Sequence, residues 1–412
     1  MKRRLLPILM TLVLVCALPI WAAFVTSGDV TNPLVSTAWA TLPDLQAKID
    51  AAADNATITL DSNTEIAATL QITKNLTLDL NGCTLRMTGD GSVLKVSGRA
   101  TLTIQDSSAE GTGTITGGNA VDGGGVYIDN NATLKMTGGC ITGCHASYGG
   151  GGIRSSGNLY MSGTAKIEKC TSNWGSDDAI WNKEGVIYAD GGTVDGMVNS
   201  QGTITCSNGT NANAATVFNK TVYLRGSNQT KRCIEAGTYN GTVENTGSIT
   251  GGAFYGTVRN QKNSMGLNIT GSVTGGTFYG PIVNEVGPGQ VTGGTFAVRF
   301  DTDGGSEIEP TMVEYDDLVP KPADPTKSGY TFIGWEDADG AYDFSKSVTA
   351  PLTLTAKWEK NPSSGGYYYY PTTDAKTDDT KSSPKTADPG VALYAALSLL
   401  SLTGLTCTAK KR

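Results

Sequence analysis

Residues 133–161 read TLKMTGGCITGCHASYGGGGIRSSGNLYM, in which short segments of alternating residues are separated by glycine-rich turns. Leu134 and Met136 are two positions apart, as are Leu159 and Met161, so each pair lies on one face of a β-strand. The segments between the glycine runs are too short for an α-helix. This stretch therefore predicts a succession of short strands that each bury one face.

The same pattern extends along the chain in both directions. Apolar pairs two positions apart recur at intervals of 25 to 36 residues, at Leu76/Leu78, Leu102/Ile104, Leu134/Met136, Leu159/Met161, Val186/Tyr188 and Val222/Leu224. Shorter segments follow them, among them Gly125-Val-Tyr-Ile and Gly152-Ile-Arg. Three short strands in about 20 to 30 residues, without a helix between them, are typical of a solenoid whose coils stack on one another. We expect Leu134, Leu159 and Val186 to lie in register on one inner face.

The repetitive stretch from Ala56 to Phe296 resembles the right-handed parallel β-helix of the pectin-lyase-like superfamily. In front of it, Thr41-Leu-Pro-Asp44 followed by Leu45 and Ile49 predicts a short capped amphipathic helix. The resemblance implies that this helix covers the first coil, whose open edge would otherwise pair with other chains. We therefore expect an all-β domain with a capping helix over residues 41–297.

Two cysteines fit this repeat. Ile141-x-x-Cys144 and Ile167-x-x-Cys170 share a spacing and lie 26 residues apart, which predicts that Cys144 and Cys170 stack in neighbouring coils. Strand spacing is compatible with a disulfide, but buried thiols in an internal ladder are favoured. Cys140 and Cys144 have no further clustered ligands, so no metal and no other cofactor is expected.

Composition excludes several classes of function. The chain has 53 glycines among 412 residues but only 15 prolines, so the glycines serve turns rather than a collagen-like or disordered chain. The formal net charge is −7, and basic runs occur only at the two ends, which argues against a nucleic-acid partner. His145 is the only histidine, which excludes multi-histidine metal sites.

Aromatic residues near polar turns are the candidates for a binding site. Trp174 and Tyr148 lie in stretches rich in Gly, Ser and Asp, where a ring can stack on a sugar. Trp181 is a third candidate, although its strand-like context in Ala179-Ile-Trp-Asn182 also fits the core. We expect the solenoid to bind a glycan or a host or neighbouring-cell surface through these residues.

A polysaccharide lyase or glycoside hydrolase of the pectin-lyase-like class is the main alternative. Such enzymes group acidic residues with a basic one, and Asp177-Asp178 is the only adjacent acidic pair in the repetitive stretch. Arg154 and His145 could join this pair across two coils. Solvated loop residues explain the same four positions more simply, so we assign no catalytic residue and favour binding without catalysis. A purely structural stalk is a third interpretation.

Composition changes at Val298, where a second domain is expected over residues 298–360. The segments Val298-Arg-Phe-Asp-Thr-Asp-Gly-Gly305, Gly329-Tyr-Thr-Phe-Ile-Gly-Trp335 and Leu352-Thr-Leu-Thr-Ala-Lys-Trp358 resemble the Listeria–Bacteroides repeat, also called the internalin B-repeat. The resemblance implies a small β-grasp-like domain of bacterial surface proteins that serves as a stalk or interaction module.

The second domain contains aromatic and acidic residues that need an interpretation. Its aromatic core is expected to consist of Tyr330, Phe332, Trp335 and Trp358. Asp301-x-Asp303-Gly-Gly and Asp337-x-Asp339-Gly superficially suggest calcium. Because Asp-Gly is ordinary turn chemistry and the remaining ligand spacing is missing, we interpret both as turns.

The N-terminal residues predict export. Lys2-Arg-Arg4 is followed by an apolar run from Leu5 to Pro19 and by the small residues Ala22 and Ala23. This order of charge, apolar run and cleavage site is that of a secretory signal peptide, which we place at residues 1–22.

The C-terminal residues predict anchoring. A low-complexity spacer over residues 361–385 leads to an apolar stretch at 391–409, which is long enough to cross a membrane and is followed by Lys410-Lys-Arg412. A pentapeptide precedes this stretch, and it consists of Ser383, Pro384, Lys385, Thr386 and Ala387. The arrangement over residues 383–412 resembles the sortase cell-wall sorting signal of Gram-positive bacteria.

The sorting-signal resemblance implies specific partners. Sortase would cleave between Thr386 and Ala387 and join Thr386 to peptidoglycan, and the apolar segment would hold the chain in the membrane before that step. An ordinary single-pass membrane anchor is the alternative. Either way, the protein is expected outside the cell, attached to the wall or the membrane.

Overall fold

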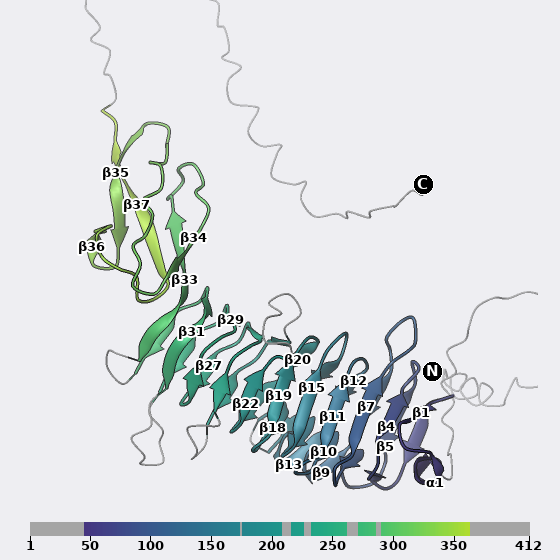
Figure 1. Cartoon of the computed structure of the whole chain (residues 1–412). Coiled ribbons are helices and arrows are strands. Elements are labelled where there is room, and N and C mark those ends of the chain that lie inside the picture. Colours follow the sequence, from purple (N-terminus) through teal and green to yellow (C-terminus); the bar gives the residue numbers. More distant parts are fainter. Residues whose placement is uncertain are drawn as a thin grey trace, which may run out of the picture. The chain divides into compact units, whose positions relative to one another are not determined.

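The computed structural model describes residues 45–173, 175–207, 216–225, 232–261, 271–285 and 290–362 (Figure 1). The expected signal peptide, the sorting signal at residues 383–387, the apolar stretch at 391–409 and nearly all of the spacer lie outside these residues. Within the described ranges, no helix is long and apolar enough to span a membrane.

The expected capping helix is present as α1 (Leu45–Ala51). Its apolar residues Leu45 and Ile49 are buried. The side chain of Gln46 accepts a hydrogen bond from the backbone amide of Gln71, with a distance of 2.7 Å. Gln71 belongs to the edge strand of one sheet, so α1 covers the start of the solenoid.

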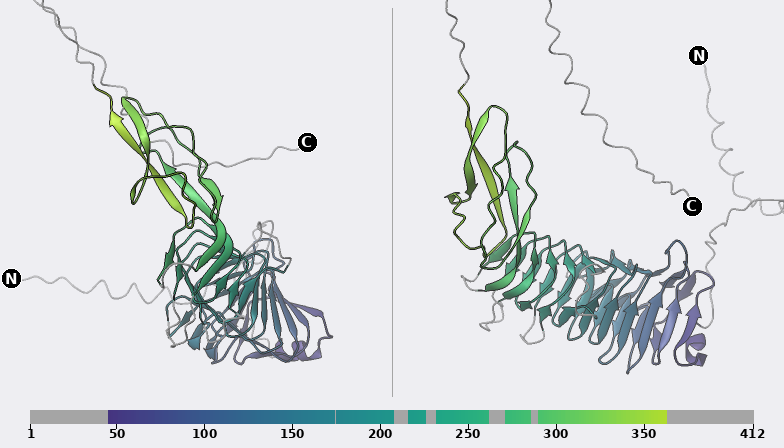
Figure 2. Two further views of the ribbon diagram at one scale, coloured as in Figure 1. Left: turned by 60° about the vertical axis from the view of Figure 1, so that its left-hand side comes forward. Right: turned by 45° about the horizontal axis from the view of Figure 1, so that its top comes forward.

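All other described elements are β-strands, and the described strands between Ala56 and Asp301 pair in parallel and stack in successive coils (Figures 1 and 2). The first ladder contains β1 (Ala56–Thr59), β4 (Leu76–Asp79), β7 (Thr101–Gln105), β11 (Thr133–Met136), β15 (Asn158–Met161), β19 (Val186–Ala189), β22 (Thr203–Thr205), β25 (Cys233–Ile234) and β28 (Ser248–Ile249). The second ladder contains β2 (Thr64–Ile66), β5 (Thr84–Met87), β8 (Thr114–Thr116), β12 (Cys140–Thr142), β16 (Lys166–Glu168), β20 (Thr193–Asp195), β23 (Val217–Phe218), β26 (Thr238–Tyr239) and β29 (Ala253–Phe254). Two longer strands, β31 (Ser272–Phe278) and β33 (Val291–Asp301), continue both ladders.

A third ladder completes each coil. It contains β3 (Leu70–Ile72), β6 (Leu94–Val96), β10 (Val126–Ile128), β14 (Ile153–Ser155), β18 (Asp178–Asn182), β21 (Met197–Ser200), β24 (Val222–Leu224), β27 (Val243–Asn245), β30 (Val258–Asn260) and β32 (Ile282–Asn284). Between the second and third ladders, three middle coils add a short sheet of β9 (Asn119–Asp122), β13 (His145–Gly149) and β17 (Thr171–Ser172). The expected parallel solenoid is therefore the architecture of this region.

The inner register is confirmed at two of the three positions chosen from the sequence. Leu134 pairs directly with Leu159, and both are fully buried. The next residue in this row is Ile187, so the expectation for Val186 is wrong by one position. The segment Val186-Ile-Tyr-Ala189 allows either alternation, and the structure buries Ile187 and Ala189.

Two other residue pairs that the sequence assigned to the inner face of the first ladder also differ from expectation. Tyr188 points outward, where its ring stacks on that of Tyr160 with 4.0 Å between centroids. The large ring of Tyr188 lies on the outer face of β19, and the small side chain of Ala189 lies on the inner face. Val222 and Leu224 are buried as expected, but they belong to the third ladder and not to the first.

Phenylalanine and tyrosine rings fill the interior of the later coils. The rings of Phe218, Tyr239, Phe254 and Phe278 stack with centroid separations of 4.8 to 4.9 Å, close to the spacing of neighbouring strands. Gly252 has φ of +101°, and a Cβ atom there would lie 3.2 Å from the rings of Phe254 and Tyr239. The Gly-x-aromatic motifs of the sequence thus provide a ring and the space beside it.

An asparagine ladder was not expected from the sequence. Asn245 donates a hydrogen bond from Nδ2 to Oδ1 of Asn260, and Asn260 donates in the same way to Asn284, both at 2.8 Å. Asn245 and Asn260 are fully buried. Each buried amide thus has a hydrogen-bond partner in the neighbouring coil, as buried polar groups require.

Cys144 and Cys170 are both buried, and both are free thiols. Their side chains interact across neighbouring coils, and this hydrogen bond together with burial raises the pKa of Cys170. The structure therefore agrees with the expected ladder of buried thiols.

Strand β33 continues into a second sheet without a break. This sheet has the order β34 (Thr311–Glu314), β33, β37 (Leu352–Lys360), β35 (Tyr330–Asp337) and β36 (Gly340–Ala341). The pair β33 and β37 is parallel and the other pairs are antiparallel. The segments between these strands, all of them described, contain no helix. The predicted boundary at 297/298 falls inside β33.

The aromatic core of this sheet differs in one residue from the expected set. Trp335 is buried, and the rings of Phe332 and Phe300 lie 5.4 and 5.1 Å from it. Trp358 packs against Phe332 at 5.5 Å. Tyr330, by contrast, is 37% exposed, so Phe300 takes the place in the core that the sequence suggested for Tyr330.

Candidate functional site

The outer face of the third ladder carries an alternating row of cations and aromatic rings. Lys95 pairs with Tyr127, Tyr127 with Arg154, and Arg154 with Trp181, each in the adjacent strand. These residues face outward because their strand neighbours, such as Val126 and Ile128 around Tyr127, fill the interior.

Within this row, which we call the cation–aromatic row, charges and rings are in contact. The ammonium of Lys95 lies 5.3 Å from the ring centroid of Tyr127. The guanidinium of Arg154 lies between two rings, 4.5 Å from Tyr127 and 5.8 Å from Trp181. Such contacts stabilise the cation and hold the rings in place.

Tyr148 joins the row from the short sheet. It lies in β13, and its ring centroid is 5.1 Å from that of Trp181 with the planes inclined by 53°. The tyrosine is 53% exposed. A Cβ atom at Gly149 would lie 3.1 Å from the indole of Trp181, so the glycine leaves room for that ring against the backbone.

A depression of about 310 Å³ lies beside the row. Its lining consists of Gly98, Tyr127, Asp129, Asn130, Arg154, Ser156, Lys183 and Glu184. This volume is at the lower end of the range for small-ligand sites. The depression therefore suits one small polar group next to the aromatic surface.

Arg154 is the most unusual residue of this site. It is only 7% exposed, and its Nε has no hydrogen-bond partner among the described residues. Asp122 lies in the neighbouring coil, and burial raises the pKa of its carboxyl, while the positive charges of Arg154 and Lys183 partly oppose this shift. No ion pair with Arg154 occurs within the described residues.

The four residues considered for catalysis, which are Asp177, Asp178, Arg154 and His145, do not form a common site. Asp177 is exposed, whereas Asp178 is buried and its Oδ2 accepts a hydrogen bond of 3.0 Å from the amide of Gly150. The interpretation as solvated loop residues is therefore wrong for Asp178, and it is also wrong for Arg154, which is buried in strand β14. Burial is the main reason why the pKa of its carboxyl is raised. The sequence did not show that the Gly-rich turn before Ile153 would enclose this side chain.

His145 and Arg154 complete the set. Nδ1 of His145 lies 2.9 Å from the hydroxyl of Thr171. Arg154 contacts the rings described above, so among the described residues no hydrogen bond or ion pair joins any two of the four candidates. Within the same part of the chain, no three His, Cys, Asp or Glu residues are grouped as metal ligands.

The structure brings together two of the three aromatic residues that the sequence suggested. Tyr148 and Trp181 are neighbours, and Trp181 is on the outer face and not in the core. Trp174 lies outside the described residues, as does the sorting signal. Sequence reasoning missed Tyr127 as part of the site. Aligning Gly125-Val-Tyr-Ile with Gly152-Ile-Arg would have placed Tyr127 and Arg154 side by side.

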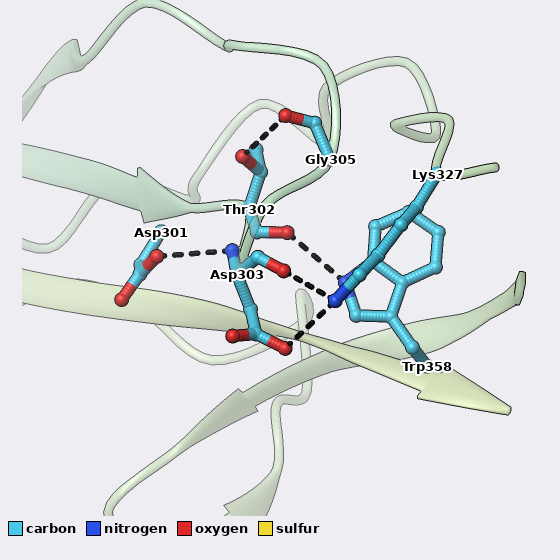
Figure 3. Close-up of polar contacts among 6 residues, drawn as sticks. All are labelled: Asp301, Thr302, Asp303, Gly305, Lys327 and Trp358. Atoms are coloured by element: carbon cyan, nitrogen blue, oxygen red, sulfur yellow. Dashed lines mark hydrogen bonds and ion pairs between the residues drawn. The ribbon is translucent and has the colours of Figure 1, made fainter. Parts of the chain in front are cut away.

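The Asp-Gly motifs of the second sheet form turns, as expected. Figure 3 shows that the carboxylate of Asp301 accepts a hydrogen bond from the amide of Asp303, at 3.0 Å. Lys327 pairs with the carboxylate of Asp303 at 3.2 Å, and the indole of Trp358 donates to the carbonyl of Thr302. Lys327 therefore supplies the positive charge beside the carboxylate of this turn. Asp337 likewise accepts from the amide of Asp339, at 2.8 Å.

Comparison with known proteins identifies the second sheet. Residues 296–357 match the Listeria-Bacteroides repeat domain family. A protein named as a membrane protein of Evansella cellulosilytica is 39% identical over 70 residues, which are 16% of this chain and 10% of that protein. Another from the same organism, named as a Gly-rich membrane protein, is 37% identical over 70 residues, or 16% of this chain and 8% of that protein.

Internalin H of Listeria monocytogenes is 38% identical over 77 residues, which are 18% of this chain and 14% of that protein. The similarity thus covers less than a fifth of this chain and of each of these relatives. No solved structure matches significantly.

Proposed function

We propose that this chain is an exported surface protein that binds glycans through the cation–aromatic row and Tyr148. The observation that carries the proposal is the contact between Tyr148 and Trp181, whose rings come from different coils and form one aromatic surface. Aromatic rings beside polar groups are suited to the apolar faces and hydroxyl groups of sugars. The depression beside Tyr127 adds donors and acceptors that can fix the orientation of a bound sugar.

The surface location is supported by the ends of the chain and by the relatives. The signal-peptide pattern at residues 1–22 leads the protein out of the cytoplasm. The pattern at residues 383–412 makes sortase and peptidoglycan its partners, after a membrane-attached stage. The names of the matching Evansella and Listeria proteins, membrane proteins and an internalin, agree with this location.

A surface array makes a shallow site effective. A single open site of this size gives weak binding, but many copies attached to one wall bind a polymer at several points at once. The Listeria-Bacteroides repeat would then serve as a spacer or second interaction module between the solenoid and the wall.

The proposal is tested with the full chain on a glycan array and with polysaccharides in solution. We expect retention of at least one class of glycan and no release of shortened or unsaturated products, with or without calcium. Product release would favour the polysaccharide-degrading alternative. Absence of binding to every glycan would favour a structural stalk.

A further inference from the structure

Two tyrosine rings are stacked on the outer face of the first ladder. Tyr160 in β15 pairs directly with Tyr188 in β19, so the two backbones are fixed in register. The ring centroids lie 4.0 Å apart, and the ring planes are inclined by only 5°. Paired residues of parallel strands project in the same direction, so each carbon of one ring faces the equivalent carbon of the other. The carbons beside the two hydroxyl groups are therefore held face to face.

The stack on this outer face consists of two phenols. The row continues beyond Tyr160 with Lys135, whose ammonium lies 5.6 Å from the ring centroid of Tyr160. Beyond Tyr188 it continues with Thr205. Neither of these neighbours is aromatic. Both tyrosines are half-buried, so a part of each ring is open to solvent and to small reagents.

Other tyrosines of the solenoid have a different environment. Tyr239 stacks on phenylalanine rings in the interior and is buried. Tyr255 and Tyr279 are stacked outside at 4.4 Å, but they lie just beyond the ends of β29 and β31. Among the described tyrosines, Tyr160 and Tyr188 are therefore the phenol pair that strand pairing holds in place.

We infer that Tyr160 and Tyr188 are a site of oxidative cross-linking, at which a carbon–carbon bond joins the two rings. The oxidant is hydrogen peroxide acting through a peroxidase. Each phenol loses one electron and its hydroxyl proton, and the unpaired electron is shared with the ring carbons beside the oxygen. One such carbon of each ring forms the new bond, and the proton that each carbon loses returns to the phenol oxygen. In total, two C–H bonds break, one C–C bond forms and one peroxide is reduced to two water molecules.

The stacked geometry favours this bond because the two carbons meet through the faces of the rings, where the unpaired electrons are located. Burial, together with the hydrogen bond to Tyr188, raises the pKa of Tyr160 to about 12. This phenol is therefore protonated at neutral pH, and its proton leaves when the electron is removed. The product joins β15 to β19 covalently and holds two neighbouring coils together. The inference does not depend on glycan binding.

The first test leaves the protein unchanged. The full chain is treated in dilute solution with hydrogen peroxide and a haem peroxidase, digested with trypsin and analysed by mass spectrometry. Trypsin separates Tyr160, in residues 155–166, from Tyr188, in residues 184–220, and each peptide contains a single tyrosine. We expect a linked product with the summed mass of these peptides less two hydrogen atoms.

The yield of this product reports on the geometry. It should exceed the yield of any product that links Tyr160 to Tyr223 by at least about 10-fold, because the stacked rings are already in contact. The same treatment in concentrated urea should remove this preference. Oxidation of tyrosines without the linked product, or an equal preference in the folded and unfolded protein, overturns the inference.

The second test changes one phenol. Tyr160→Phe keeps a ring in the stack but has no hydroxyl group, so the linked product should be lost while the circular dichroism spectrum is unchanged. Tyr223→Phe is the matched control, because Tyr223 faces outward on the third ladder beside Arg225, and it should leave the yield unchanged. After oxidation, the natural protein should unfold at a higher temperature than Tyr160→Phe. Equal loss of the product in both variants, or equal unfolding temperatures of the oxidised proteins, contradicts the inference.

Discussion

The ring of Tyr148 lies 5.1 Å from that of Trp181, although one belongs to the short sheet of one coil and the other to the third ladder of the next. The contact depends on the glycine turn after Tyr148, where Gly150 has φ of +64°. A solenoid places residues from successive coils side by side, so a surface site can be assembled from positions that are far apart in sequence.

Truncation of the inner row should destabilise the solenoid. Leu159 is fully buried between Leu134 and Ile187, so Leu159→Ala should lower the free energy of unfolding by about 2–5 kcal/mol. Leu159→Asp should prevent folding, because it buries an unpaired charge. Lys135→Asp, on the outer face of the neighbouring strand, is the control and should fold normally. Wild-type thermal stability of Leu159→Asp would show that the register is wrong.

The aromatic interior predicts a second contrast between adjacent residues. Phe254→Ala removes a ring stacked between Tyr239 and Phe278 and should cost about 3–5 kcal/mol in urea unfolding. Tyr255→Ala, at an exposed position, should cost much less although it removes a similar side chain and its stack with Tyr279. Equal losses would contradict the placement of Phe254 inside and Tyr255 outside.

The buried carboxyl of Asp178 predicts a pH dependence. Burial raises its pKa above the ordinary value of 3.8, despite hydrogen bonds from Ser172 and Gly150 that favour the charged form. The folded state then holds this proton more tightly, so the associated stability is fully present below pH 3.8 and is lost as the pH rises through the raised pKa. The variant Asp178→Asn keeps a side-chain oxygen that can accept the hydrogen bond from the amide of Gly150, but its side chain has no titratable proton.

Unfolding of the natural protein and of Asp178→Asn is therefore compared from about pH 3 to about pH 8. We expect the natural protein to lose stability relative to the variant as the pH rises. A difference that is the same at every pH would mean that Asp178 titrates normally in the folded state.

Anchoring is tested at the proposed sorting signal. If Thr386 becomes joined to peptidoglycan, Thr386→Ala should move the protein from the wall fraction to the membrane fraction, because the uncleaved apolar segment remains. Ser382→Ala, just before the pentapeptide, is a suitable control and should leave the distribution unchanged. Covalent wall attachment of Thr386→Ala would exclude the sortase route.

Much of the fold could be predicted because a coil repeats a simple alternation. The two-residue alternation alone placed Leu134 and Leu159 correctly on the inner face. The expected cap and the spacing of its apolar residues predicted helix α1. Val186 was misplaced because Val186-Ile-Tyr-Ala189 offers two apolar alternations, and only packing decides between them. The asparagine ladder of Asn245 and Asn260 gave no local signal, since it depends on equivalent corners in different coils.

The site was harder to predict than the fold. Tyr148 and Trp181 were recognised as ring-bearing candidates, but their contact depends on the stacking of two coils. Nε of Arg154 has no hydrogen-bond partner among the described residues, and this depends on its three-dimensional surroundings, which no sequence pattern marks. Asp178 could not be distinguished from Asp177 by sequence, although one is buried and the other exposed.

The most direct test of the account is glycan binding by the full chain with its two contacting rings removed together. The array with natural protein first identifies a bound glycan, and binding of that glycan is then measured for the Trp181→Ala, Tyr148→Ala double variant. The control is Tyr160→Ala, Tyr188→Ala, which removes another pair of contacting outer rings on the first ladder. We predict that the Trp181→Ala, Tyr148→Ala variant binds the glycan at least about 10-fold more weakly than the natural protein. The control variant should bind it with unchanged affinity. Unchanged binding by a folded Trp181→Ala, Tyr148→Ala protein would contradict the account.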